Sequence, residues 1–263
     1  MRFDHLLPIL ASQRQWQLDL LLDECDFIQL NHPLRTPLTS DDIMRKLSGY
    51  RIIELDSGHS TECQYWDVAL SAGHYSFGLA NDDLHYPDRS DKIARRCNLL
   101  ATPSADWKDV AQRLKEGGYY SMRLPDNGNG NWEEKYAQNS DIPRISNIGV
   151  RGDTIYLSLS ENAKRIVAFG QDHRTLLDIS DTHEAEYRLP HDEPYARFVI
   201  YFDSGEVIYT NPFARYDKSM GDHPTTNSVH STNITLTILY NLLIILLCGA
   251  IIVAIRRVWR NKY

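Results

Sequence analysis

Apolar runs alternate with helix-like segments over the first 125 residues. The apolar runs predict strands over 25–33, 50–56, 75–82 and 119–124. The segments beside them predict helices over 13–24, 41–47, 62–73 and 104–116. We expect the short polar side chains of Thr39-Ser40-Asp41-Asp42 to cap the start of one helix, Ser104 to cap another, and Gly117-Gly118 to end the latter. Strands and helices that alternate with short links are typical of an α/β fold with a parallel sheet or barrel.

The pattern changes after residue 125. Residues 126–142 are polar and rich in turn formers, which predicts a linker. Short apolar runs separated by turns then follow as far as residue 213, and they predict a small β-sandwich-like module over 143–217. Residues 218–235 have the composition of a flexible tether.

A transmembrane helix is predicted over 236–255, a stretch of 20 residues without a charge. That length matches the ~20 residues that a helix needs to cross a bilayer. The tail over 256–263 is basic, which predicts that it lies in the cytoplasm and the body on the exoplasmic side. However, the first residues lack the apolar core of a secretory signal. The chain is therefore either tail-anchored with a cytoplasmic body, or preceded by a signal sequence with an exoplasmic body.

Charge and cysteine content narrow the class of protein. The net charge of the chain is −7. Because the last eight residues are basic and contain no acid, the rest of the chain is more acidic than this total. We therefore expect no nucleic-acid partner held through a broad basic surface. None of the four cysteines forms a C-x-x-C pair, which argues against a zinc knuckle or a redox motif.

Polar residues follow three of the predicted strands. Asn31-His32-Pro33 ends the first, Glu54 and Asp56 end the second, and Asp83-x-His85 follows the third. Because parallel strands deliver their carboxyl ends to one face, this order predicts a metal site or a general base there. Taken alone, Asn-His-Pro is more often a turn, and Asp-x-His more often belongs to a solvated loop.

Several stretches resemble the PHP (polymerase and histidinol phosphatase) domain superfamily of metal-dependent phosphoesterases. They are "IQLNHP", "YRIIELD", "YWDVALSAGHYSFGLANDDLH" and "WKDVAQRLKEGGYYSMR", with a looser likeness at "NPFARYD". The resemblance implies that residues 1–125 are the C-terminal part of a distorted (β/α)7 TIM-like barrel. A small β-sandwich and one transmembrane helix would follow.

The resemblance also implies metal ligands and a substrate class. His32, Asp83 and His85 match the family's later ligand positions, for Zn, Mn, Mg or Fe. Asp82 would orient His85, and Arg35 would meet an oxygen of a phosphorylated small molecule. The family's H-x-H pair and its Asp-His element are absent from the chain, so the ligand set is incomplete.

Two functions follow as expectations. The first is a PHP-like metal-dependent phosphoester hydrolase, or an N-terminally truncated fragment of one, weakly active or inactive by itself. The alternative is a non-catalytic, membrane-anchored binding or scaffold protein that uses its β-module.

Overall fold

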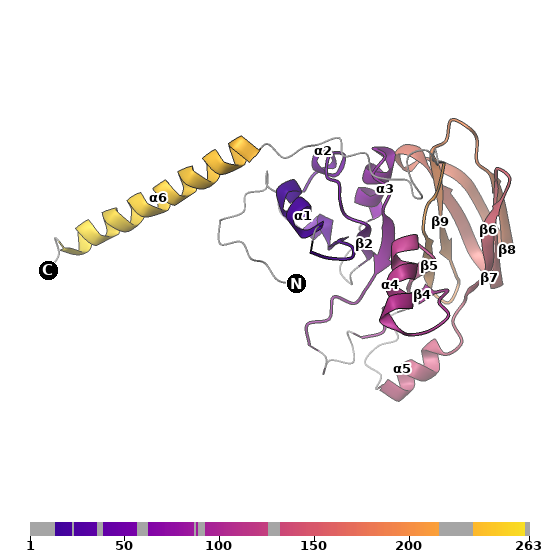
Figure 1. Ribbon diagram of the computed structural model, residues 1–263. Coiled ribbons are helices and arrows are strands. Elements are labelled where there is room, and N and C mark those ends of the chain that lie inside the picture. Colours follow the sequence, from indigo (N-terminus) through magenta and orange to yellow (C-terminus); the bar gives the residue numbers. More distant parts are fainter. Residues whose placement is uncertain are drawn as a thin grey trace.

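The computed structural model describes residues 14–22, 24–35, 39–56, 63–86, 88, 93–125, 132–215 and 234–260. Their elements form a small parallel sheet with helices, a large antiparallel sheet beside it, and a separate C-terminal helix (Figure 1).

The parallel sheet has the strand order β1-β2-β3. These strands are β1 (Gln29–Leu30), β2 (Ile52–Asp56) and β3 (Phe77–Ala80). The helices of this region are α1 (Arg14–Leu22), the short 3-10 helix η2 (Pro33–Arg35), α2 (Asp41–Met44) and α3 (Cys63–Ser71). Every residue of β2 is buried, as expected for the central strand of a covered parallel sheet. Ser40, which lies in the helix start predicted over 39–42, caps α2, because its side chain accepts a hydrogen bond from the backbone N–H of Ile43.

The antiparallel sheet has the path β4-β5-β10-β9-β7-β6, with β8 paired to β7 and β11 to β9. Its strands are β4 (Arg96–Leu100), β5 (Tyr119–Arg123), β6 (Ile145–Arg151), β7 (Thr154–Phe169), β8 (Thr175–Arg188), β9 (Tyr195–Tyr201), β10 (Val207–Thr210) and β11 (Phe213–Ala214). The helices of this region are α4 (Trp107–Glu116), α5 (Trp132–Asn139) and the 3-10 helix η4 (Gln171–His173). The sheet curls into a half-barrel (Figure 1).

The prediction of a partial (β/α)7 barrel followed by a separate sandwich is wrong. The run over 119–124, expected as a fourth parallel strand, is β5, which pairs antiparallel with both β4 and β10. No strand was predicted over 96–100, where the structure has β4. β4 lies just before α4 in the chain, and β5 pairs with it in the antiparallel direction. Strands from both halves of the chain therefore share one sheet.

The apolar runs over 154–160 and 165–172 predict two short strands, but the structure has a single long strand, β7, in their place. β7 runs for 16 residues through the polar stretch 160–164, where no glycine or proline interrupts it. The ladder with β8 shifts register there, between the pairs Ser158–Glu184 and Ala163–Thr182. A β-bulge of this kind bends a strand without ending it.

Polar side chains of the antiparallel sheet cover the outer edge of β3. Asn98 pairs with Ala80 like a strand backbone, accepting its N–H at 3.1 Å and donating to its carbonyl at 2.7 Å. Ser121 Oγ donates to the carbonyl of Gly78, and Asn211 Oδ1 accepts the N–H of Gly78. The edge groups of β3 are thus satisfied without a fourth parallel strand.

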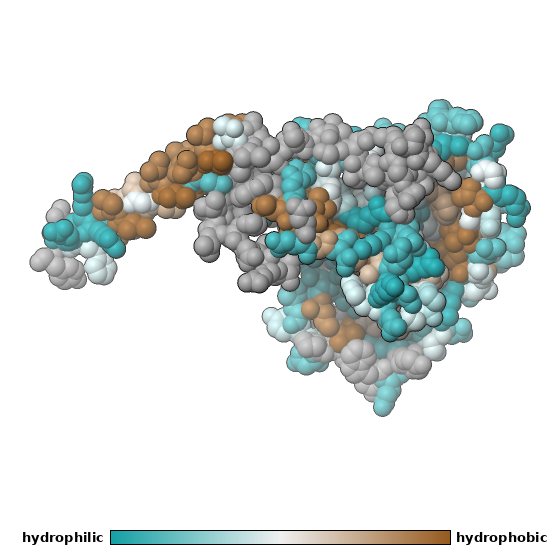
Figure 2. Space-filling view, viewed as in Figure 1, coloured by the Kyte–Doolittle hydropathy of each residue, from teal (hydrophilic) through white to brown (hydrophobic). Residues whose placement is uncertain are grey.

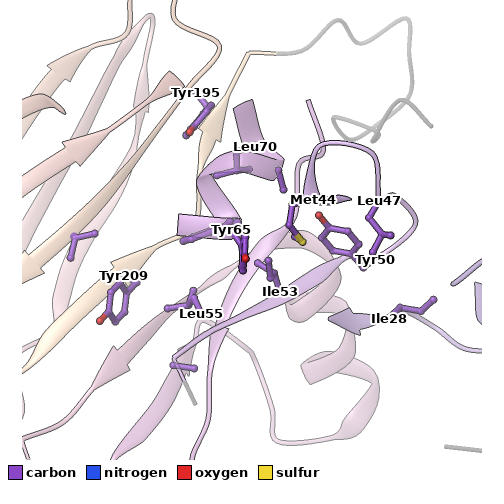
Figure 3. Close-up of a cluster of buried hydrophobic side chains, with 14 of the residues drawn as sticks. Ile28, Met44, Leu47, Tyr50, Ile53, Leu55, Tyr65, Leu70, Tyr195 and Tyr209 are labelled. Atoms are coloured by element: carbon purple, nitrogen blue, oxygen red, sulfur yellow. The ribbon is translucent and has the colours of Figure 1, made fainter. Parts of the chain in front are cut away.

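An apolar core joins the two sheets. Tyr195 and Tyr209 of the antiparallel sheet lie in the same buried cluster as Ile53, Leu55 and Leu70 (Figure 3). A second cluster, which includes Phe198 and Ile200, fills the half-barrel itself.

The C-terminal helix α6 (Ile234–Arg260) stands apart from the sheets (Figure 1). Ile238–Arg260 within it are long and apolar enough to cross a membrane. Most of its large apolar side chains are exposed, and they colour the helix brown in Figure 2. It is the one candidate span within the described ranges, and it fits a single-pass or tail-anchored membrane protein.

Candidate functional site

The carboxyl ends of the three parallel strands bring polar residues together, as their order along the chain predicted. The backbone N–H of His32, after β1, donates to Glu54 Oε2 of β2 at 2.6 Å. Arg35, in the turn after β1, reaches Asp83 after β3, with 2.7 Å between Nη2 and Oδ2. Segments 48 residues apart in the chain are thus linked at one edge of the sheet.

The three predicted metal ligands lie at this edge. The ion pair with Arg35 is the main reason that the pKa of Asp83 is lowered, and His85 and His32 add smaller electrostatic effects. The His85 side chain is 69% exposed, and its Nδ1 lies 2.7 Å from the backbone carbonyl oxygen of Asp83. His32 and Asp83 both have positive φ, at 29° and 49°, a conformation that is uncommon outside glycine.

The fit of these residues to a metal is partial. Imidazole and carboxylate groups suit a divalent cation. However, no three His, Cys, Asp or Glu side chains of the described ranges gather closely enough to hold an ion. The carboxylate of Asp83 is also engaged by Arg35. The ligand assignment therefore stays a prediction, and no reaction step is derived through a metal.

Glu54 is a buried acid of the edge, with 1% of its surface exposed. Burial raises its pKa, although the N–H of His32 and the side chain of Asn81 oppose that rise. A carboxyl group held in this way takes up a proton more readily than an exposed one.

Asp82 anchors the chain that leads to β4. Its Oδ1 accepts the backbone N–H groups of Arg95 at 3.1 Å and Arg96 at 2.9 Å. These bonds tie the end of β3 to the start of the antiparallel sheet; no bond to His85 is among them. Asp56, the last residue of β2, binds Arg96 Nε at 2.7 Å through Oδ1.

A buried ion cluster lies on α3, away from this edge, and the sequence analysis did not single it out. Asp67 accepts hydrogen bonds from Nε of Arg197 at 2.7 Å, from its Nη2 at 2.5 Å, and from His173 Nδ1. Although burial acts to raise the pKa of Asp67, the charge of Arg197 and the bonds from His173 and Arg197 lower it. The sequence did contain a signal for this pair: Asp67 is the one acid in the predicted helix over 62–73 after its first residue, and Arg197 is the one charged residue in the apolar run over 195–201.

A hollow lies beside β3, between the strands at the two ends of the path of the antiparallel sheet. It has a volume of about 660 Å³ and is lined mainly by apolar and aromatic side chains, such as Phe77, Leu99, Tyr120, Ile148 and Phe213. These come from β3, β4, β5, β6 and β11. A hollow of this size and character is typical of ligand sites in proteins.

No protein-family model matches the chain. No curated protein matches it either. The resemblance to the PHP superfamily therefore remains a prediction from the quoted motifs.

Proposed function

We propose that this chain contributes His32, Asp83 and His85 to a divalent-metal phosphoester hydrolase site on a membrane-anchored body. The observation that carries the proposal is the meeting of β1, β2 and β3 at one carboxyl edge, through the bonds His32–Glu54 and Arg35–Asp83. In open α/β sheets, ligands bind at the carboxyl ends of the strands.

The chemistry of the edge supports the same proposal. It combines imidazole and carboxylate groups, which suit a divalent cation, with guanidinium groups, which suit phosphate oxygens. A divalent cation would supply Lewis-acid polarisation of a phosphoryl group. Because the donor set is incomplete, we expect weak metal binding and little or no hydrolysis by the chain alone.

Metal binding tests the ligand assignment directly. Titration of the full chain in detergent with Mn²⁺ or Zn²⁺, followed by calorimetry, should give a measurable affinity. His85→Ala should lower the metal affinity by about tenfold or more, because losing even a residue that only hydrogen-bonds to a ligand costs about that much. His183→Ala is the matched control, since that side chain is 57% exposed on β8 and contacts Asn162. Equal effects of the two substitutions would refute the assignment.

The basic tail favours one orientation of the membrane span. Arg256, Arg257 and Arg260 follow the apolar stretch directly, with no acid among them. By the positive-inside rule, we propose that this end lies in the cytoplasm and the sheets on the opposite side of the membrane.

A binding protein is the second candidate, and the hollow of the curled sheet favours it. If the chain binds a ligand through this hollow instead of hydrolysing one, Ile148→Trp should abolish binding of that ligand and leave metal binding unchanged. Screening apolar ligands by their effect on the melting temperature is the corresponding test.

A further inference from the structure

β6 is an edge strand of the antiparallel sheet, and little protects it. It pairs with β7 on one side, and the path of the sheet ends there. Its seven residues, "ISNIGVR", hold one charge, at Arg151, and its first N–H, that of Ile145, is accepted by the hydroxyl of Tyr120. Natural proteins cover or charge such edges, because their free N–H and C=O groups pair readily with another strand.

Other edges of the described sheets do carry protection. β8 is the outer neighbour of β7 and holds four acids, namely Asp178, Asp181, Glu184 and Glu186. On β4, the N–H of Arg96 is accepted by the carboxylate of Asp82. Within the described ranges, β6 therefore differs from the other edges in being both apolar and uncovered.

The geometry of the hairpin shows which groups of β6 face away from the sheet. A turn of two residues joins β6 to β7, so Arg151 and Thr154 at its two ends exchange hydrogen bonds. Because bonded pairs alternate along an antiparallel ladder, the N–H and C=O groups of Ile148 and Val150 point away from β7. Within the described ranges, no other strand pairs with these two residues.

Two hollows follow the inner face of β6. The hollow of about 660 Å³ is lined by Ile145 and Ile148, and a second one, of about 290 Å³, is lined by Val150. Phe213 lines both of them. Ile148 packs against the core of the half-barrel, and Val150, two residues later on the same face, is 54% exposed. A strand added beside β6 would direct alternate side chains toward these hollows.

Arginines lie at both ends of β6. Arg144 precedes the strand and Arg151 ends it, and both are exposed. Neither forms an ion pair with a residue of the described ranges. Antiparallel pairing of two copies of β6 about Ile148 would bring Arg151 of one copy beside Arg144 of the other, and like charges destabilise a strand pair. The charges therefore favour a partner with acidic residues over a second copy of this chain.

We infer that β6 binds an extended peptide of a partner protein, which adds a strand to the antiparallel sheet. The peptide has apolar side chains at alternate positions, which enter the two hollows, and an acidic residue near each end, which meets Arg144 or Arg151. In strand addition, main-chain hydrogen bonds supply affinity, and pockets for alternate side chains supply specificity. The inference rests on the second candidate function, binding through the hollow, and names its kind of partner.

A library of random peptides displayed on phage, selected against the full chain in detergent, provides the probe. The enriched sequences should alternate apolar and polar residues and carry acids near their ends. One of them is synthesised with a fluorescent label, and its affinity is measured by anisotropy. Two further forms are N-methylated at the odd or at the even residues. One form should bind and the other should not, because only every second N–H of an added strand faces β6.

Variants of Val150 test the position of the peptide. Val150→Pro removes an outward N–H and leaves the ladder with β7 intact, a placement that proline tolerates on an edge strand. It should lower the peptide affinity about tenfold or more, because a carbonyl of the bound peptide loses its donor, and its melting temperature should stay close to that of the wild type. Val150→Lys, which charges the edge, should weaken binding in the same way. Thr175→Lys is the matched control: it adds the same charge at an exposed position of β8 and should bind like the wild type.

The inference is overturned if no peptide is enriched, if the Val150 variants bind the peptide as tightly as Thr175→Lys, or if both N-methylated forms bind. Light scattering gives the oligomeric state in the same detergent. A wild type that is dimeric and becomes monomeric in Val150→Lys would assign the edge to a second copy and overturn the assignment to a peptide. The metal titration of His85→Ala and the thermal screen of apolar ligands are separate measurements, so failure here is distinct from failure of either proposed function.

Discussion

Replacing Asp67 by Asn should destabilise the protein strongly, because it breaks a buried ion pair. The Asp67 side chain is 2% exposed, and that of its partner Arg197 is 0% exposed. The Arg197 guanidinium lies 4.9 Å from the ring of Trp66 and 5.2 Å from the ring of Phe169. Because the Arg197 side chain is fully buried, solvent cannot take the place of the lost carboxylate.

The size of the effect follows from this burial. Removing one partner of a buried ion pair costs about 3–5 kcal/mol, since it leaves the other charge uncompensated. The lost bond from His173 adds little, because that side chain is 53% exposed. At roughly 2–4 °C per kcal/mol for a chain of this size, the melting temperature should fall by roughly 6–20 °C.

Thermal unfolding of the full chain in detergent, followed by circular dichroism, measures the change. Asp178→Asn is the control, because it removes an acid from an exposed pair with Arg165 and should cost less than about 1 kcal/mol. The double variant Asp67→Leu/Arg197→Met should regain most of the loss, since apolar side chains of similar size replace buried ion pairs well. If Asp67→Asn costs no more than the control, or the double variant is as unstable as the two single changes summed, the reasoning is wrong.

The remaining predictions concern pH dependence, the link between the sheets, and membrane orientation. Because the pKa of Asp67 is lowered, its contribution to stability is present above the unfolded pKa of about 3.9 and is lost as the pH falls through the folded pKa. When the melting temperature is measured at decreasing pH, it should fall less in Asp67→Asn than in the wild type. The raised pKa of Glu54 has the opposite effect on stability. Its contribution is fully present below the unfolded pKa of about 4.3 and is lost as the pH rises through the folded pKa. Glu54→Gln should therefore reduce this loss in the same titration. Asn98→Ala should cost about 1–3 kcal/mol for each of the two backbone groups of Ala80 that it leaves unsatisfied, and urea unfolding against the exposed control Asn147→Ala checks this. Cys25 is exposed, so a membrane-impermeant maleimide should label the protein in intact cells if the sheets lie outside. The variant Cys25→Ser should be labelled less. Labelling only after permeabilisation would place the sheets in the cytoplasm.

Local patterns were sufficient for individual elements. The prediction of a candidate membrane span needs only length and composition, and the predicted stretch 236–255 lies inside α6. The strand predicted over 50–56 contains β2, and Gly117 ends α4 with a left-handed φ of 73°, which glycine adopts without strain. The helix cap predicted at Ser104 was misplaced, because the structure puts the N-cap of α4 at Asp106.

Part of the candidate site could also be read from the order of elements. Polar residues after successive buried strands must meet if the strands are parallel, and His32, Glu54 and Asp83 do lie at one edge. What the pattern could not show was the pairing within that edge, such as Arg35 with Asp83, since hydrogen-bond partners depend on the path of the loops.

The sequence by itself determined which segments are buried, where several of them end, and that one helix suits a membrane. Only the tertiary structure decided the direction in which strands pair and the partners of buried charges. Periodicity reflects the surroundings of a residue along its own element. However, β5 pairs with β10 more than 80 residues away, and Asp67 contacts Arg197, which lies 130 residues later in the chain. Such contacts form only when the whole chain has folded, because their free energy comes from joint burial of both partners.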